Sequence, residues 1–114
     1  MTDTPTHGIA VATALTAVGD GRWEGVLDEA WSIGGRPNGG YLMAAMAAAA
    51  SAETGRDLPL GITAVFTQPP AFGPVVMAVE TIRSGRTVSA VRVRVEQSGT
   101  SCAEALISIG DATA

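Results

Sequence analysis

With 114 residues the chain has room for a single small domain, and a composition of 46% hydrophobic and 16% charged residues predicts a folded core rather than disorder. The net charge of −4 at pH 7 argues against a nucleic acid as the main partner. The longest apolar run, Leu42–Ala50, has nine residues, which is too short to span a membrane.

The beginning of the sequence predicts a flexible lead and then a β-hairpin. Residues 1–9 are polar, and we expect them to precede a single domain over residues 10–111. The turn signal Gly19-Asp20-Gly21 separates two strand-like segments, Ala10–Val18 and Arg22–Asp28. The N-terminus lacks a basic region followed by an apolar run, so we expect no signal peptide and a cytoplasmic location.

The middle of the sequence predicts a loop and one long helix. The loop covers Trp31–Gly40 and is rich in glycine. Residues 39–53 are mainly alanine, leucine and methionine, which favour a helix. Because this segment is apolar almost all round, we expect the helix to be buried. Gly55 suits the position that caps its C-terminal end.

The second half of the sequence predicts four strands. Turn residues separate segments with strand-like patterning: Ile62–Gln68, Val75–Arg83, Thr87–Gln97 and Ser101–Ile109. We expect these strands to form a meander, with the helix against one face of an α+β fold. An antiparallel sheet wrapped around one long buried helix is the hotdog arrangement. Element order alone also fits a cystatin-like or another α+β fold.

The junction Asn38-Gly39-Gly40 is the strongest candidate site. A helix that begins here leaves backbone N–H groups without partners, and the helix dipole adds partial positive charge. Such an end can hold a phosphate, a carboxylate or the carbonyl oxygen of a thioester. The alternative is a tight turn with Asn38 as the helix cap and no ligand.

Other polar residues have two interpretations each. Arg83 and Arg86 flank a turn, where they could bind phosphates of coenzyme A or form ion pairs with Asp57, Glu80 or Glu96. Arg92 and Arg94 lie on the polar face of an alternating strand, which favours solvent exposure. Thr63, Gln68 and Gln97 are neutral candidates for orienting a water, or else structural hydrogen-bond partners.

The remaining titratable residues argue against several common kinds of catalytic and metal-binding site. His7 is the only histidine and lies in the expected lead, which argues against a histidine-dependent triad or hydratase. One histidine and one cysteine also predict no zinc site. The single cysteine, Cys102, excludes an internal disulfide and favours a reducing compartment, and we expect it to be partly buried and inert. Glu53, the carboxylate on the helix, lies far from the glycine junction, so a role as base would need a second subunit.

Four segments together resemble the first hotdog domain of the TesB-like acyl-CoA thioesterase superfamily. The resemblance covers roughly residues 10–111, and the Asn-Gly-Gly-Tyr helix start and the Arg-Ser-Gly-Arg-Thr turn are its most specific parts. The segments are Trp31–Ala45, Thr63–Pro69, Ile82–Ser89 and Glu96–Gly99. The resemblance implies the hotdog fold, a dimeric or double-domain assembly, and hydrolysis of fatty acyl-CoA.

The resemblance also suggests site residues. The expected catalytic residues are Asn38, Gly39, Gly40 and Gln68, and the expected substrate contacts are Tyr41, Thr63, Arg83 and Arg86. In that family the catalytic group lies mainly in a second hotdog domain and includes an aspartate on its helix. The segment Tyr41–Ala52 has no Asp, Glu or His, so that group does not carry over.

These observations predict an acyl-CoA thioesterase that acts as a hotdog dimer or higher oligomer, or together with a second hotdog domain. Coenzyme A would enter as part of the substrate, with no other cofactor, no metal, no nucleic acid and no membrane. The alternative is a non-catalytic N-terminal half of a split or longer thioesterase, serving acyl binding or dimerisation. A hotdog that binds a hydrophobic ligand without chemistry is a further alternative.

Overall fold

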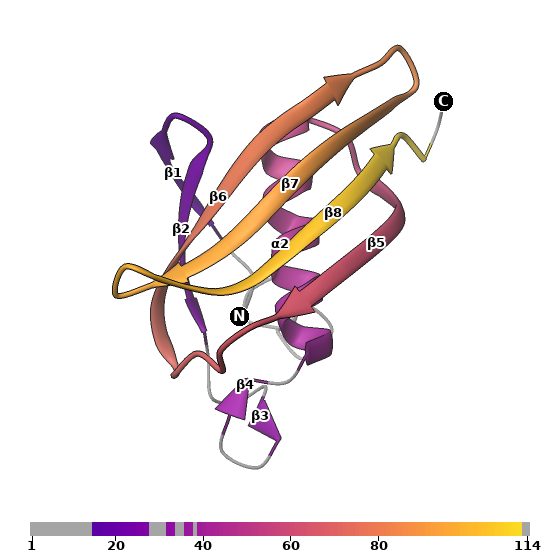
Figure 1. The fold of residues 1–114 in the computed structure, drawn as a ribbon. Coiled ribbons are helices and arrows are strands. Elements are labelled where there is room, and N and C mark those ends of the chain that lie inside the picture. Colours follow the sequence, from indigo (N-terminus) through magenta and orange to yellow (C-terminus); the bar gives the residue numbers. More distant parts are fainter. Residues whose placement is uncertain (1–14, 28–31, 34–35, 38, 113–114) are drawn as a thin grey trace, which may run out of the picture.

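In the part of the chain that the structure describes, a six-stranded antiparallel sheet packs against a long helix (Figure 1). The computed structural model describes residues 15–27, 32–33, 36–37 and 39–112, so the predicted lead lies outside it. The helix is α2, Gly39–Thr54. The strands of the large sheet are β1 (Thr16–Gly19), β2 (Arg22–Leu27), β5 (Leu58–Phe66), β6 (Gly73–Ser84), β7 (Val88–Gln97) and β8 (Thr100–Gly110).

The order of strands in the sheet is β1-β2-β6-β7-β8-β5, and every neighbouring pair is antiparallel. The predicted hairpin of β1 and β2 is present, although residues 10–14 of its first segment lie outside the described residues. Two short strands, β3 (Ser32–Ile33) and β4 (Arg36–Pro37), pair with each other within the predicted loop. The α+β hotdog fold expected from the sequence is confirmed.

The predicted meander of four strands is wrong at its first step. β5 pairs with β8, where Ile62 lies opposite Ile107, while β6 pairs with β2 and β7. Pro69 and Pro70 lie in the connection after β5, and proline lacks the N–H group that a tight hairpin ladder needs. The chain therefore crosses the end of the sheet, so β5 and β6 lie on opposite sides of the β7–β8 hairpin (Figure 1).

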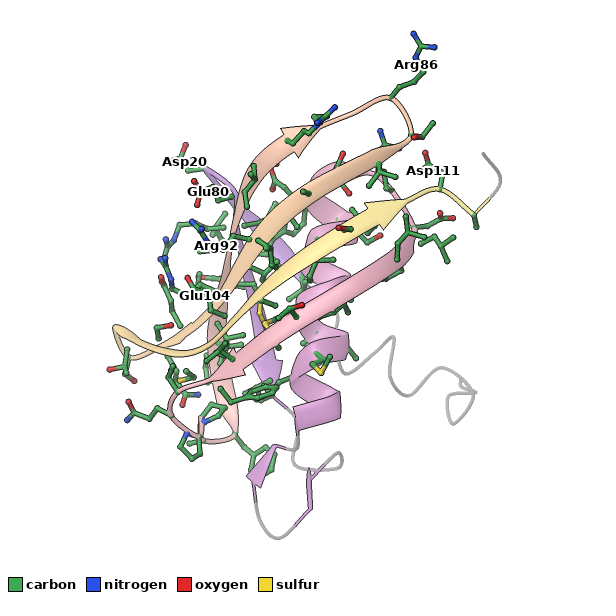
Figure 2. All side chains as sticks on the ribbon, turned by 45° about the vertical axis from the view of Figure 1, so that its right-hand side comes forward. Asp20, Glu80, Arg86, Arg92, Glu104 and Asp111 are labelled. Atoms are coloured by element: carbon green, nitrogen blue, oxygen red, sulfur yellow. The ribbon has the colours of Figure 1, made fainter. Side chains whose placement is uncertain are left out.

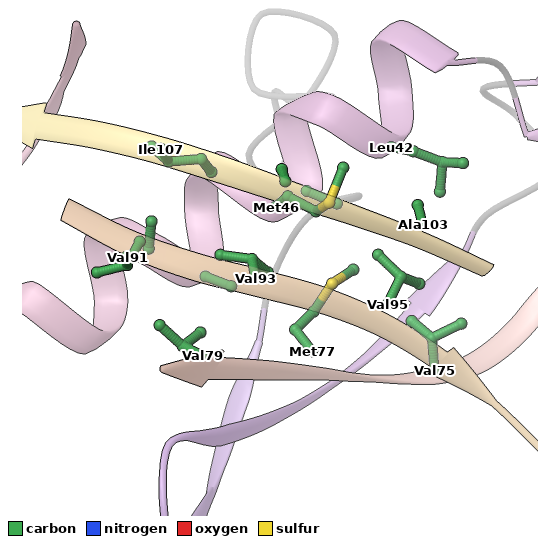
Figure 3. Close-up of a cluster of buried hydrophobic side chains, with 14 of the residues drawn as sticks. Leu42, Met46, Val75, Met77, Val79, Val91, Val93, Val95, Ala103 and Ile107 are labelled. Atoms are coloured by element: carbon green, nitrogen blue, oxygen red, sulfur yellow. The ribbon is translucent and has the colours of Figure 1, made fainter. Parts of the chain in front are cut away.

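One stripe of α2 faces the sheet and forms the core with it. Its buried side chains recur at helical spacing: Tyr41, Leu42, Ala45, Met46, Ala49 and Ala50. They pack with buried apolar side chains of the inner sheet face, among them Met77, Val91, Val93, Val95, Ala103 and Ile107 (Figure 3). The small alanines allow the helix to approach the sheet closely. Across the described ranges, no helix combines the length and apolar character needed to cross a membrane.

Two turns predicted from the sequence are confirmed by backbone geometry. Gly55 has a φ of 75°, and its N–H donates to the carbonyl of Ser51 at 2.9 Å, which is the expected cap of α2. Ser98 and Gly99 have φ values of 53° and 78° and join β7 to β8 in a tight hairpin. This hairpin places the ends of β7 and β8 beside the segment that follows β5.

Candidate functional site

A pocket of about 320 Å³ lies where α2 begins. The helix contributes Gly39 and Leu42 to its lining, and the segment that ends β5 and follows it contributes Phe66, Thr67, Gln68, Pro69 and Pro70. Most of these lining side chains are apolar, so the pocket suits an uncharged, apolar group. The structure therefore brings together two of the residues predicted to be catalytic, Gly39 and Gln68.

On one side of the pocket, the first turn of α2 exposes its backbone. Gly39 and Gly40 are exposed, and N–H groups in the first turn of a helix have no partner within the helix. A Cβ atom on Gly39 would lie 3.5 Å from Cζ of Phe66, so glycine keeps the space between the ring and the helix open. The first turn has no acidic side chain to offset the positive end of the dipole. Asn38 lies outside the described residues.

Gln68 lies on the facing wall and has a free carboxamide among the described residues. Its backbone N–H donates to the carbonyl oxygen of Cys102 at 3.2 Å, which fixes the residue. Its side chain is exposed and lines the pocket, with no hydrogen bond to another described residue. A carboxamide offers one acceptor oxygen and two N–H donors, so it can orient a water but cannot take a proton from it at neutral pH.

Two predicted substrate contacts, Tyr41 and Thr63, lie away from the pocket lining. Tyr41 is 5% exposed and its hydroxyl lies 3.5 Å from the carbonyl oxygen of Val26, so its ring belongs to the core. Thr63 is exposed on β5, while its neighbours Ile62 and Ala64 pack against the core. Because side chains alternate along a strand, Thr63 points to the outer face of the sheet.

Arg83 and Arg86, also predicted as substrate contacts, lie at the opposite end of the molecule. Figure 2 shows Arg86 at the β6–β7 hairpin. Arg56, which follows the C-terminal end of α2, donates to the carbonyls of Gly85 and Arg86, so this hairpin lies at that end of the helix. α2 has 16 residues and is therefore about 24 Å long. Within one chain, the two arginines do not join the pocket.

The ion pairs predicted for Arg83 and Arg86 are not formed with described residues. Glu80 pairs with Arg92 at 2.9 Å, and Glu96 pairs with Arg22 and Arg94. The carboxylate of Asp57 accepts the N–H of Ala112. Other described residues therefore already pair with the three carboxylates predicted as partners of Arg83 and Arg86. The same pairs confirm that Arg92 and Arg94 lie on the polar face of β7.

The remaining candidates have structural partners. Glu53 accepts a hydrogen bond at 2.8 Å from the indole Nε1 of Trp23, at the end of α2 far from the pocket. Gln97 bonds to the backbone of Ala71, so it does not orient a water by itself. Cys102 is buried, and burial raises the pKa of its thiol, which agrees with an inert cysteine.

Several lining residues were missed by sequence reasoning, namely Leu42, Phe66, Thr67, Pro69 and Pro70. An apolar side chain on a pocket wall and one in the core look alike in a sequence. The run Phe-Thr-Gln-Pro-Pro was the available signal, because two prolines after a strand force an irregular segment that cannot pair. Among the described residues, no group of three or more His, Cys, Asp or Glu side chains is placed to hold a metal.

The chain matches a known protein family, a related protein and several solved structures. Residues 27–110 match the model of the family described as acyl-CoA thioesterase N-terminal domain. A thioesterase-like protein of Talaromyces wortmannii, TwmA, is 38% identical over 76 residues, which is 64% of this chain and 22% of that protein.

Three solved structures superimpose well on the chain. A thioesterase II of Thermobifida fusca has a TM-score of 0.85 and 28% identity over 90% of this chain and 38% of its own. A tesB protein of Mycobacterium avium subspecies paratuberculosis has a TM-score of 0.77 and 28% identity over 90% of this chain and 41% of its own. A hot dog fold protein of Alicyclobacillus acidocaldarius, 26% identical, has a TM-score of 0.83, with 92% of this chain and 40% of its own covered. The chain thus spans about two fifths of the length of these structures.

Proposed function

The chain belongs to the family of acyl-CoA thioesterase N-terminal domains, and from this premise we propose that it takes part in hydrolysis of acyl-CoA thioesters as one of two paired hotdog units. The observation that supports this most directly is the pocket at the start of α2. It combines open helix N–H groups at Gly39, a free carboxamide at Gln68 and apolar walls. Those are the parts needed to hold a thioester carbonyl beside an apolar acyl chain.

In the proposed reaction, the acyl chain lies against Leu42 and Phe66, and the carbonyl oxygen points at the first turn of α2. Water attacks the carbonyl carbon, and N–H groups at Gly39 and Gly40 stabilise the negative charge that develops on the oxygen. The carboxamide of Gln68 orients the water. The C–S bond then breaks, giving the free acid and coenzyme A as the thiol, so water supplies both the hydroxyl and the proton.

A second hotdog unit is part of this proposal because the described pocket lacks a base. Its polar side chains, Thr67 and Gln68, stay neutral at physiological pH. β5 is an edge strand of the large sheet, and Leu58–Phe66 has no charged side chain to deter pairing. A second copy or a further hotdog domain joined edge to edge there would supply the base. We place this assembly in the cytoplasm, with acyl-CoA as its substrate.

A non-catalytic half is the second candidate function. The same lack of a titratable side chain in the described pocket lining favours it. In this case the chain binds the acyl group and the partner, and the chemistry belongs to the partner unit.

Turnover and native mass measured on one sample separate the two functions. Purified protein is assayed with acetyl-, decanoyl- and palmitoyl-CoA, while its native mass is measured at the assay concentration. Turnover by a species of two or more units is the expected result. Binding of decanoyl-CoA without turnover at any chain length would favour the non-catalytic half, and neither binding nor turnover would contradict both.

Gly39 allows a direct test of the oxyanion role. In Gly39→Val the added methyl groups fill the space beside Phe66, and kcat should fall on the order of 10²-fold. Gly39→Ala places only a Cβ in ordinary contact with the ring, so its loss should be smaller. Ala52→Val adds a branched side chain at an exposed position at the far end of α2 and is the control. An unchanged kcat in folded Gly39→Val would remove this role from Gly39.

A further inference from the structure

The two walls of the pocket are held in place by different parts of the molecule. The wall at Gly39 and Leu42 belongs to α2, whose buried stripe fixes it to the sheet. The facing wall belongs to the segment between β5 and β6, residues 67–72, which has no helix or strand of its own. Pro69 and Pro70 have no N–H group to donate, so other groups have to hold this segment.

Those other groups come from the β7–β8 hairpin. The N–H groups of Thr67 and Gln68 both donate to the carbonyl of Cys102, at 3.0 and 3.2 Å. The hydroxyl of Thr67 donates to the carbonyl of Ser101 at 3.0 Å. These contacts hold the beginning of the segment, at the point where Gln68 enters the pocket.

The side chain of Gln97 makes hydrogen bonds to the other half of the segment. Its Oε1 accepts the N–H of Ala71 at 2.8 Å. Its Nε2 donates to the carbonyls of Ala71 at 2.9 Å and Pro74 at 3.3 Å. The carboxamide thus pairs with both polar groups of one peptide residue, as a neighbouring strand would. Pro70 is buried and Phe72 packs against the core next to this contact.

The chemistry of the contact requires glutamine. It needs an acceptor and a donor on the same planar group at the same reach. Glutamate offers no donor to the two carbonyls, methionine offers neither group in useful strength, and asparagine is one carbon shorter. The β7–β8 turn at Ser98 and Gly99 places Gln97 at the end of β7, directly beside the segment.

We propose that Gln97 is a positioning residue that sets the width of the acyl pocket. It does not line the pocket, and it acts through Ala71 on the wall that contains Gln68, Pro69 and Pro70. This inference rests on the proposed function, since it concerns the affinity of the same pocket for an acyl thioester. It predicts that loss of Gln97 weakens substrate affinity most, because the pocket loses a fixed wall. The chemical step is affected less, because the oxyanion donors on the helix stay in place, although Gln68, which orients the water, is displaced together with that wall.

The test compares Gln97→Met with a variant that weakens the fold elsewhere. Gln97→Met is expected to raise KM for decanoyl-CoA roughly tenfold, since three hydrogen bonds are lost. kcat is expected to fall by a smaller factor, because only Gln68, and not the oxyanion donors, moves with the wall. Gln97→Glu keeps the bond to the Ala71 N–H and loses both donors, so it should also raise KM. Ser89→Ala removes a buried hydrogen bond at the opposite end of the molecule and is the control, with KM unchanged.

Amide hydrogen exchange gives a readout that does not need turnover. The N–H of Gln68 does not touch Gln97, so faster exchange there in Gln97→Met, but not in Ser89→Ala, shows that the wall moves as one unit. A wild-type KM in Gln97→Met, or an equal rise in Ser89→Ala, overturns the inference. If wild type hydrolyses no acyl-CoA, the proposed function fails by itself. The positioning role is then decided by exchange: unchanged protection at Gln68 in Gln97→Met overturns it.

Discussion

At the end of the molecule opposite the pocket, the side chain of Arg56 makes four hydrogen bonds to other described residues. Its Nε donates to the hydroxyl of Ser89 at 3.0 Å, and its Nη1 pairs with Asp111 at 2.7 Å. Its Nη2 donates to the carbonyls of Gly85 and Arg86. With 13% of its side chain exposed, the guanidinium joins the end of α2, the β6–β7 hairpin and the end of β8.

Replacement of Arg56 by alanine is expected to lower the free energy of unfolding by about 3 kcal/mol, because four hydrogen bonds are lost and the buried hydroxyl of Ser89 loses its donor. Arg56→Lys should recover only part of this, since an ammonium lacks the planar fork. Urea unfolding followed by tryptophan fluorescence measures the change. Arg92→Ala breaks an exposed ion pair and is the control, with a cost below about 1 kcal/mol. Equal losses in both variants would contradict a special role for Arg56.

Two of the residues predicted to be catalytic, Gly39 and Gln68, lie at one pocket, and both were predicted from local patterns, while their catalytic roles stay predictions. Gly39 was found because a glycine before a helix has a direct mechanical meaning, and Gln68 because a polar residue ends a strand before two prolines. Arg56 was missed because its partners lie far along the chain, and no local pattern identifies them. The same holds for the pairing of Trp23 with Glu53.

At the scale of elements, the contact between α2 and the sheet depends on small side chains. Ala49 is fully buried and faces the sheet, whereas Ala52 on the same helix is exposed. Ala49→Leu should therefore lower the free energy of unfolding by about 1–3 kcal/mol through overpacking. Ala52→Leu makes the same change in solvent and should stay within about 0.5 kcal/mol of wild type. Thermal or urea unfolding of both variants measures these changes. An unchanged free energy of unfolding in Ala49→Leu would mean that the interface between α2 and the sheet can accommodate a larger side chain.

The helices and strands themselves could be predicted from the sequence more completely than the pairing of strands within the sheet. The composition of residues 39–53 and the glycine at position 55 located α2 to within one residue of its observed end at Thr54. Alternation along β7 identified its buried face, but alternation says which face a side chain takes and not which strand lies beside it. For this reason the pairing of β5 with β8 was not foreseen. Pro59 and Gly61 also obscured the start of β5 at Leu58.

At the scale of the whole molecule, the two edges of the sheet differ. β1 has four residues, whereas β5 has nine and exposes Val65 at 58% and Leu60 at 55%. Both strands have a register irregularity, which in β5 lies near its start, between Pro59 and Gly61. A long, uncharged edge strand favours pairing with another strand. β5 is therefore the edge at which we propose that a second hotdog unit joins.

Thr63→Lys tests this assembly if the second unit is another copy of the chain. Thr63 lies near the middle of β5, so a two-fold pairing would bring two lysines close together and weaken the dimer several-fold or more. Ser108→Lys places the same charge on the same outer face of β8, an internal strand, and is the control. Sedimentation velocity over a range of concentrations gives the masses. A dimer as tight as wild type in Thr63→Lys would exclude self-pairing through β5.

The two pocket walls are held by different elements, and this has a consequence for how the substrate preference of such a protein can change during evolution. The wall at Gly39 is tied to the core of α2, where most changes disturb folding, so natural selection is expected to preserve it. The facing wall is attached to the tip of the β7–β8 hairpin, where the carboxamide of Gln97 makes hydrogen bonds to its second half. Substitutions at the tip of this hairpin can change which acyl groups fit the pocket, while the N–H groups at Gly39 and Gly40 keep their positions. Directed evolution for a new acyl preference would thus begin at the hairpin and leave the helix alone.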